Sequence, residues 1–277
     1  MFEMLGQSYL LEAAAVVGRI AATQATAIQK AADVIACSLR DGGLLYLFGT
    51  GHSASVAVEP YHRAGGLVPV RPIVEPAMTL HDSPAKATAL ERLEGYAKIL
   101  IAGSGMKRGD VLIVISNSGI NAVPVEMALG SRALGVKVIA VTSIEHSSAQ
   151  PSRHAGGKRL FEVADIVIDN CGIPGDAAIE TPACPVRIGP TSTLAGVAIV
   201  NAISAEVVGR LHEMGIEPPV MVSSNIAGGD GHGARWEVAF ADPGAARLTS
   251  SPSDTVRIHG EECGTRRVER GIVRAEG

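Results

Sequence analysis

Residues 111–119 have the sequence VLIVISNSG, an uninterrupted apolar run followed directly by small polar residues and a glycine. A run of this length, rich in valine and isoleucine, predicts a strand that is buried on both faces, as the strands of parallel sheets are. Residues 122–134 then have the composition of a helix, in which Pro124 is tolerated in the first turn. The stretch therefore predicts a strand, a tight loop and a helix, which form the repeating unit of an α/β fold.

The same order of strand and helix repeats on both sides of this stretch. We expect further strands at residues 44–48, 68–74, 136–141 and 166–168, and further helices at residues 53–64, 88–102 and 191–211. Pro69 and Pro72 place the strand at 68–74 toward an edge of the sheet, and residues 75–87 are expected to be irregular. The repeat predicts a doubly wound, open parallel sheet that is covered by helices on both faces.

The two ends of the chain differ from this middle part. Residues 1–40 are rich in alanine and predict one long helix or two shorter ones, while residues 41–230 hold the α/β domain. Residues 231–277 contain seven arginines, no lysine and scattered prolines, and they have no sustained hydrophobic period. We therefore expect a loosely ordered, irregular tail there.

Composition and charge exclude several classes of protein. Hydrophobic residues make up 47% of the chain and aromatic residues only 3%, so the core must be built from small aliphatic side chains, as in α/β proteins. The net charge of -4 offers no basic face for nucleic acid or for an anionic membrane. The N-terminus does not resemble a signal peptide, and the longest uncharged stretch, 188–205, is interrupted by Pro190 and by polar residues. We therefore expect a cytoplasmic protein without a membrane span.

The loop after the strand at 44–48 combines glycines with polar side chains. Gly49 and Gly51 let the backbone N–H groups approach a ligand, and Thr50, His52 and Ser53 surround the start of the next helix. The free amides and the dipole of a helix N-terminus favour anions. Taken alone, this loop is better explained by an ordinary tight turn in which Ser53 caps the helix.

The loop after residues 111–115 repeats this chemistry. Ser116, Asn117, Ser118 and Asn121 surround one helix N-terminus and offer more hydrogen-bond donors than one cap needs. Two such loops at neighbouring strand ends indicate a cradle for a phosphate group, and Ser143 at the end of the next strand is expected to contact the same ligand. Neither loop has the lysine of a Walker sequence, and the first lacks the full GxGxxG of dinucleotide folds, so we expect no cofactor.

The two loops resemble those of the SIS (sugar isomerase) domain of phosphosugar isomerases, phosphosugar lyases and sugar-responsive regulators. The most specific stretch is SNSG at residues 116–119, followed by a helix, a glycine and VKVIAVT at residues 136–142. The resemblance covers about residues 40–210 and implies a flavodoxin-like fold. Within this family, the sequence most resembles a bacterial subgroup of stand-alone SIS proteins, which is related to phosphoheptose isomerase and N-acetylmuramic acid 6-phosphate etherase. The stretches that carry this closer resemblance are residues 49–53, 91–96, 152–154, 157–160 and 189–193.

This resemblance also implies roles for individual residues. It assigns phosphate binding to Ser53, Ser116 and Ser118. Asn121 stands where SIS proteins often have threonine or serine, and it can still donate a hydrogen bond.

A metal site is a further possibility, because some SIS heptose isomerases bind zinc. The residues that would form it are His52, His62, His81 and Asp82. Their spacing does not require a metal, so we expect none.

Glu59 and His62 are the first candidates for acid–base chemistry. On one helix these positions share a face, and aldose–ketose isomerisation needs a base next to the carbonyl and an acid for the oxygens. The alternative is an ordinary surface pair. Glu59-Pro60 also resembles the segment of the etherase in which a glutamate abstracts the C2 proton, so the resemblance implies that Glu59 is the base.

Glu91 and Glu94 offer a second carboxylate. Glu94 is followed by Gly95, which resembles another acid–base glutamate of the etherase. The alternative is a solvated pair bonded to Arg92 or Lys98 on the same helix.

Together with the resemblance, these residues imply an enzyme that binds a phosphorylated sugar, either a hexosamine such as N-acetylglucosamine 6-phosphate or a related sugar 6-phosphate such as that of a heptose. The resemblance to the etherase implies that it acts by C2-proton abstraction, as an isomerase or a lyase. The alternative is a non-catalytic phosphosugar-binding regulator, although no helix-turn-helix precedes the domain. Because SIS domains commonly pair, we expect a homodimer with the site at the subunit contact, in which the N-terminal helix takes part.

Overall fold

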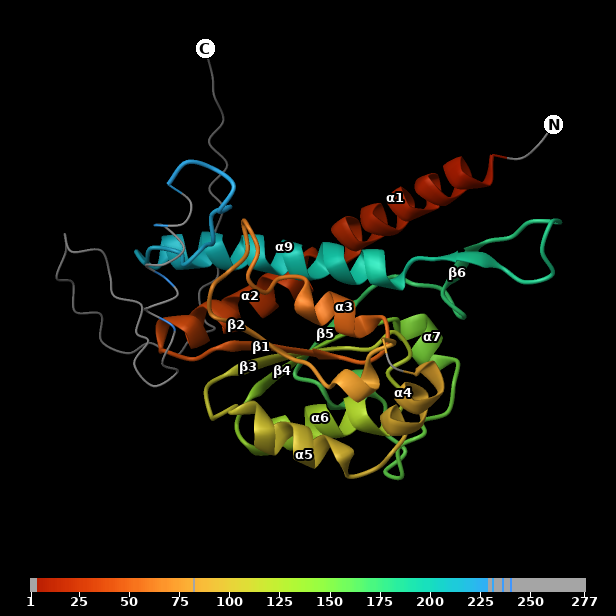
Figure 1. Ribbon diagram of the computed structural model, residues 1–277, viewed down its shortest axis with the longest axis horizontal. Helices are drawn as coiled ribbons and strands as arrows, with labels where there is room; N and C mark the ends of the chain where they lie inside the picture. Colours follow the sequence, from red (N-terminus) through yellow and green to blue (C-terminus); the bar gives the residue numbers. More distant parts are fainter. Residues whose placement is uncertain (1–3, 82, 229–230, 232–235, 237–239, 241–277) are drawn as a thin grey trace, which may run out of the picture.

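A computed structural model describes residues 4–81, 83–228, 231, 236 and 240, and its centre is a five-stranded parallel sheet (Figure 1). The strand order is β2-β1-β3-β4-β5, and each strand pairs in parallel with its neighbours. The strands are β1 Leu45–Gly49, β2 Val70–Ile73, β3 Val111–Ile115, β4 Lys137–Thr142 and β5 Ile166–Asp169. The prediction of a doubly wound parallel sheet is confirmed, with β2 at one edge as its prolines indicated.

Helices cover both faces of the sheet. One face carries α1 Leu5–Thr23, α2 Ala25–Arg40, α3 Ser53–Val58 and α9 Ser192–Glu213. The other face carries α4 Pro84–Glu91, α5 Tyr96–Ser104, α6 Ala122–Ala133 and α8 Leu160–Val163 (Figure 1). Two short helices, η1 Pro76–Met78 and α7 Ile144–Ser148, lie in loops that follow β2 and β4.

Successive side chains along each strand point to opposite faces of the sheet and so contribute to two separate hydrophobic cores. Leu45 and Leu47 of β1 belong to the cluster under α2 and α9, whereas Tyr46 and Phe48 belong to the cluster under α5 and α6. All five residues of β1 are buried, as are all five of β3. Burial on both faces explains why these strands are continuous apolar runs in the sequence.

Three predicted segments differ from the structure because of glycine and proline. The helix expected at 53–64 ends at Val58, two residues before Pro60. The helix expected at 88–102 is divided into α4 and α5 by Gly95, which has a φ of +80° that interrupts any right-handed helix. Residues 75–87 are irregular only in part: η1 occupies 76–78, and α4 begins at Pro84, where Ser83 accepts a hydrogen bond from the Lys86 N–H at 3.3 Å.

The segment between β5 and α9 forms a hairpin that was not predicted. Its strands, β6 Ala177–Ile179 and β7 Ile188–Pro190, pair in an antiparallel manner and lie against α1. The Tyr9 hydroxyl donates to the Pro190 carbonyl at 2.9 Å, which ties α1 to the hairpin. Together α1 and the hairpin extend beyond one end of the sheet (Figure 1).

The N-terminal helices pack into the same core as the sheet. Of the two alternatives predicted for residues 1–40, the structure has two shorter helices, α1 and α2, which meet at Gln24, and α2 packs along α9. In the described part of the chain, α9 is the one helix long and apolar enough to cross a membrane by length and composition. Its buried side chains belong to the core between α2 and the sheet, which accounts for its hydrophobicity. The tail predicted for residues 231–277 lies outside the described residues, apart from Gly231, Trp236 and Phe240.

Candidate functional site

The two glycine- and serine-containing loops lie side by side at one edge of the sheet. β1 and β3 are neighbours, and Gly49 at the end of β1 pairs with Ile115 at the end of β3. The chain leaves β1 toward β2 on one side and leaves β3 toward β4 on the other. The loops therefore lie at the topological switch point, where ligands bind in open α/β sheets.

The first loop is shaped by its two glycines. A Cβ atom on Gly49 would lie 2.4 Å from the carbonyl oxygen of Ser53, so only glycine allows the loop to close on itself. Gly51 has a φ of +55°, and its N–H donates to the Met78 carbonyl at 2.8 Å. Thr50 is buried, while Ser53 is half-buried as the first residue of α3. The Ser53 hydroxyl makes no hydrogen bond to any residue that the structure describes, so it is available to a ligand.

The second loop is held by its own polar groups. The Ser116 hydroxyl is buried and accepts from the Gly119 N–H at 3.1 Å, while Asn117 Oδ1 accepts from Asn170 Nδ2 at 2.8 Å. Gly119 has a φ of +59°, and a Cβ atom there would lie 2.9 Å from Thr142 Oγ1. Ser118 is half-buried, and its hydroxyl has no hydrogen-bond partner within the described ranges.

Asn121 precedes the first turn of α6 and is buried. Its side chain does not cap the helix; instead, Asn121 Oδ1 accepts from Arg153 Nη1 at 3.1 Å. The backbone N–H of Arg153 also donates to the Ile120 carbonyl at 2.8 Å. The segment around Arg153 is thereby fastened to the start of α6.

Ser143 lies behind the second loop. It is fully buried and caps α7, where its hydroxyl accepts from the His146 N–H at 3.1 Å. The hydroxyl proton is donated to the Gly172 carbonyl, and the Ser143 N–H donates to the Asn117 carbonyl at 3.1 Å. Its single proton is thus unavailable to a phosphate, and the contacts indicate a role in supporting the loop.

A cavity of about 1050 Å³ extends from the first loop along α3. Its lining includes Gly51, His52, Ser55, Glu59, Thr79 and His81. The Glu59 side chain is 15% exposed, and Oε1 accepts from Arg63 and from Asn201 Nδ2, the latter at 3.1 Å. Oε2 is buried and accepts no hydrogen bond from any residue that the structure describes. In the Glu59 carboxylate, Oε1 is therefore held by hydrogen bonds from Arg63 and Asn201, whereas Oε2 accepts none from the described residues.

His62 does not share a helix face with Glu59, so that expectation is wrong. The helix ends at Val58, and His62 follows in a turn with a φ of +47°. The His62 ring is exposed, lies 6.1 Å from the Tyr61 ring and does not line the cavity that Glu59 lines. The arrangement offers no direct support for His62 as the partner of Glu59.

Glu91 and Glu94 lie apart from Glu59. Glu91 is the last residue of α4, and Glu94 is exposed in the following turn. Glu94 Oε1 accepts from the Ala155 N–H at 2.6 Å, which places it beside the segment that carries Arg153. Glu94 is therefore associated with the second loop, whereas Glu59 is associated with the first.

One ionisable group behind the cavity wall has a displaced pKa. Burial raises the pKa of Tyr96, and the neighbouring Glu75 carboxylate raises it further. Glu75 also accepts from the Ala77 N–H at 3.0 Å and so holds η1, whose Pro76 lines the cavity. Tyr96 is therefore a neutral phenol at physiological pH.

Within the described ranges, which do not include Asp82, no three histidine, cysteine or acidic side chains converge on one point.

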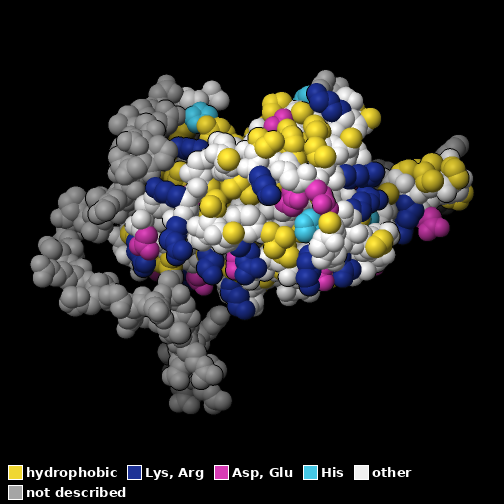
Figure 2. All heavy atoms as spheres, turned by 90° about the horizontal axis from the view of Figure 1, so that it is seen from below, with side chains coloured by type: hydrophobic (Ala, Val, Ile, Leu, Met, Phe, Trp, Pro, Cys, Tyr) yellow, Lys and Arg dark blue, Asp and Glu magenta, His cyan; other side chains and the backbone are white. Residues whose placement is uncertain are grey.

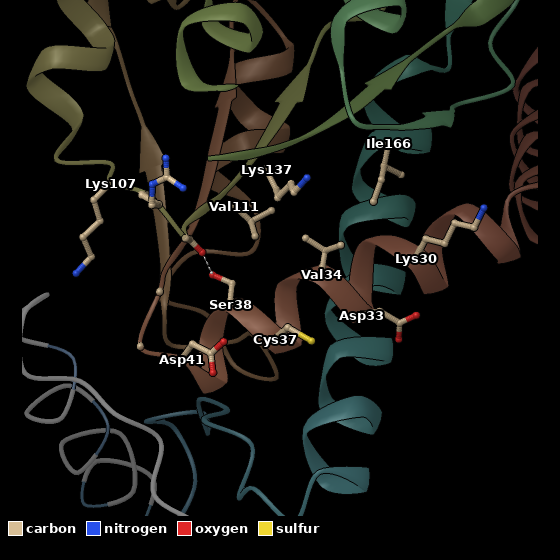
Figure 3. Close-up of a pocket in the computed structure, with 14 residues that line it drawn as sticks. Lys30, Asp33, Val34, Cys37, Ser38, Asp41, Lys107, Val111, Lys137 and Ile166 are labelled. Atoms are coloured by element: carbon tan, nitrogen blue, oxygen red, sulfur yellow. Dashed lines mark hydrogen bonds between the residues drawn. The ribbon is translucent and has the colours of Figure 1, made fainter. Parts of the chain in front are cut away.

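A cavity of about 730 Å³ lies at the opposite edge of the sheet, where β3, β4 and β5 begin (Figure 3). Figure 3 shows that its charged side chains surround an apolar floor formed by Val34, Val111 and Ile166. On the face shown in Figure 2, lysines and arginines alternate with acidic and apolar side chains rather than forming one patch.

Comparison with known proteins identifies the family. Residues 8–143 match the SIS domain model. The chain is 45% identical to a UPF0309 protein of Geobacillus thermodenitrificans over 210 residues, which are 76% of this chain and 84% of the relative. The chain belongs to the UPF0309 family of SIS-domain proteins. A second UPF0309 protein, from Geobacillus kaustophilus, is also 45% identical, over 76% of this chain and 83% of its own length.

Among solved structures, a phosphoheptose isomerase from Francisella tularensis matches the UPF0309 chain with a TM-score of 0.49 and 19% identity. The match covers 74% of this chain and 98% of the isomerase.

Two polar residues at the site, Arg63 and Arg153, have sequence signals that mark them. Arg63 follows Glu59 by four residues, the spacing of a helical ion pair. Arg153 belongs to one of the stretches that resemble the stand-alone SIS subgroup, but the resemblance implies no role for it.

Proposed function

We propose that this UPF0309 protein binds a phosphorylated sugar of the hexosamine 6-phosphate class and abstracts its C2 proton, acting as an isomerase or a lyase. The observation that carries the proposal is Glu59 Oε2, a buried carboxylate oxygen without a described hydrogen-bond partner on a residue that lines the cavity. Oε2 need break no hydrogen bond to accept a proton, but it is covered in the unbound structure, so the proposal requires the Glu59 side chain to shift toward the cavity when the sugar binds. Membership of the SIS family supports the sugar-phosphate ligand.

The phosphate would lie between the two loops. The Ser53 and Ser118 hydroxyls have no partner among the described residues, and both lie at the carboxyl edge of the sheet. The twelve-residue helix α6 begins at the second loop, and its N-terminal amides and dipole favour an anion. With the phosphate there, the sugar would extend along the cavity toward Glu59.

The reaction would begin with an open-chain aldehyde. Glu59 removes the proton from C2, and the electron pair of the C–H bond forms an enol or enolate with the adjacent carbonyl. Return of a proton to C1 yields a ketose when C2 carries a hydroxyl. Departure of a substituent from C3 yields an elimination product, and this branch is open to N-acetylated substrates.

Binding and turnover of a panel of sugar 6-phosphates test this function. The panel contains N-acetylglucosamine, glucosamine, glucose and heptose phosphates, each paired with its unphosphorylated sugar, and products are followed by NMR. We expect calorimetric binding of at least one phosphate ester and none of its unphosphorylated partner. Binding without a product or proton exchange would indicate a non-catalytic regulator, and an absence of binding across the panel would refute the proposed function.

We also propose that two copies of the chain pair through α1. Leu10 and Leu11 are 67% and 65% exposed, while Ala13, Val16 and Ile20 on another face of the helix are buried in the chain's own core. The charged side chains on α1 are Glu12 and Arg19, which pair with each other at 3.0 Å. An exposed apolar helix face of this kind is typical of a protein–protein interface.

Leu11→Glu is expected to convert the dimer to a monomer, because it places a charge in the apolar contact. Sedimentation velocity of the wild type and the variant measures the change. Ile99→Glu is the matched control, since Ile99 is equally exposed at 65% on α5, across the sheet from α1. A wild type that sediments as a monomer at every concentration would contradict the pairing.

A further inference from the structure

Arg153 is placed beside the second loop by two contacts. Its backbone N–H donates to the Ile120 carbonyl at 2.8 Å, and its Nη1 donates to Asn121 Oδ1 at 3.1 Å. The side chain forms no ion pair with any residue that the structure describes. Of the five N–H donors of a guanidinium, one is therefore used, and the others make no hydrogen bond to a residue of that part of the chain.

This position is electrostatically unfavourable for a cation in the absence of an anion. Asn121 immediately precedes α6, whose N-terminus carries the positive end of the helix dipole. A guanidinium fixed there adds a full positive charge to a partial one. In contrast, the nearby Arg159 has its charge balanced by Glu162, at 3.1 Å from Nε to Oε2. Arg153 has no such ion pair in the described part of the chain, and Glu94, whose carboxylate its segment contacts, accepts from the Ala155 N–H instead. An anion bound at the second loop would supply the partner that Arg153 lacks.

We propose that Arg153 binds the phosphate group of the ligand from the open side of the second loop, and that Asn121 positions it. The inference rests on the proposed function, because the phosphate is the one held by Ser53 and Ser118. It also explains why Asn121 does not cap α6: its amide oxygen is used to orient the guanidinium. Arginine suits this task because its planar fork matches two phosphate oxygens at once.

The role of Arg153 sets the charge of the ligand that binds best. The loops contribute hydroxyl and amide donors, so Arg153 supplies the formal positive charge that a Walker loop takes from its lysine. A phosphate dianion would therefore be preferred over a sulfate ester or a carboxylate at the same carbon. Binding should also weaken as the salt concentration rises, because Arg153 is exposed.

The test is calorimetric titration of wild type and Arg153→Gln with N-acetylglucosamine 6-phosphate, the other sugar 6-phosphates of the panel, and inorganic phosphate. Loss of a charge-assisted contact should weaken binding by about 10- to 100-fold. Arg153→Lys, which keeps the charge but loses the fork, should recover part of that loss. Arg108→Gln is the control, because Arg108 lies at the opposite edge of the sheet and its loss changes the net charge equally.

The outcomes separate this inference from the proposed function. If the wild type binds a sugar phosphate and Arg153→Gln binds it equally well, the role of Arg153 is refuted while the function stands. If inorganic phosphate binds in an Arg153-dependent manner but no sugar phosphate binds, the function is refuted and the anion site stands. If Arg153→Gln and Arg108→Gln lose affinity equally, the loss reflects only the change in net charge, and the inference about Arg153 is refuted. If the wild type binds neither a sugar phosphate nor inorganic phosphate, the inference and the proposed function are both refuted.

Discussion

Glu59→Gln is expected to slow C2-proton exchange by about 100- to 10,000-fold, the contribution typical of a positioned general base. The substitution keeps the shape of the side chain. The glutamine carbonyl can still accept from Arg63 and Asn201 as Glu59 Oε1 does. The basic oxygen Oε2 is replaced by an amide nitrogen, which cannot take a proton from carbon. Binding of the sugar phosphate should be retained, because the phosphate contacts lie in the loops.

Exchange is measured by NMR in heavy water, and affinity is measured by calorimetry on the same preparation. Glu145→Gln is the matched control, because Glu145 is exposed in the first turn of α7 and does not line the cavity. Its exchange rate should equal that of the wild type. If Glu59→Gln exchanges normally while Glu94→Gln does not, the base is Glu94 and the role proposed for Glu59 is refuted.

Gly49→Ala is expected to abolish sugar-phosphate binding and to destabilise the fold by about 3 kcal/mol, at the upper end of typical overpacking costs. The added Cβ would meet the Ser53 carbonyl oxygen at 2.4 Å and its carbon at 2.6 Å. Both are backbone atoms, so no side-chain rotation can relieve the contact. The start of α3 must move, and it carries Ser53 away from the second loop.

Urea unfolding and calorimetry measure the two effects of Gly49→Ala. Gly103→Ala provides a control in which the change in unfolding free energy should have the opposite sign. A Cβ at Gly103, inside α5, meets nothing within 4 Å, so the change should stabilise the protein by about 0.5–1 kcal/mol through helix propensity. If Gly49→Ala binds sugar phosphate normally, the tight first loop is not required for the ligand.

The strands were predictable because burial on both faces leaves a strong pattern in the sequence. β3 has the bounds that the run VLIVI indicates, and the two loops follow from strand ends that any parallel sheet brings to one edge. The end of α3 was misplaced because Pro60 ends the helix before the residue pair that a longer helix would have aligned. The prediction that His62 shares a face with Glu59 depends on that longer helix.

Sequence patterns do not predict contacts between segments that lie far apart in the chain. Asn201 lies 142 residues from Glu59 and reaches it because α9 packs beside α3. Arg153 reaches Asn121 from a loop 32 residues later in the chain. Each pairing depends on how helices and loops pack over the sheet, and a single sequence carries no periodic signal for such packing.

Deuterium incorporation is the measurement that tests the proposed chemistry most directly. The wild-type protein is incubated in heavy water with N-acetylglucosamine 6-phosphate and the other sugar 6-phosphates of the panel, and the C2 proton signal is followed by NMR. We expect the C2 signal of at least one phosphate ester to disappear while the matching unphosphorylated sugar keeps its signal. Retention of the C2 proton in every sugar phosphate that the protein binds would contradict proton abstraction by Glu59.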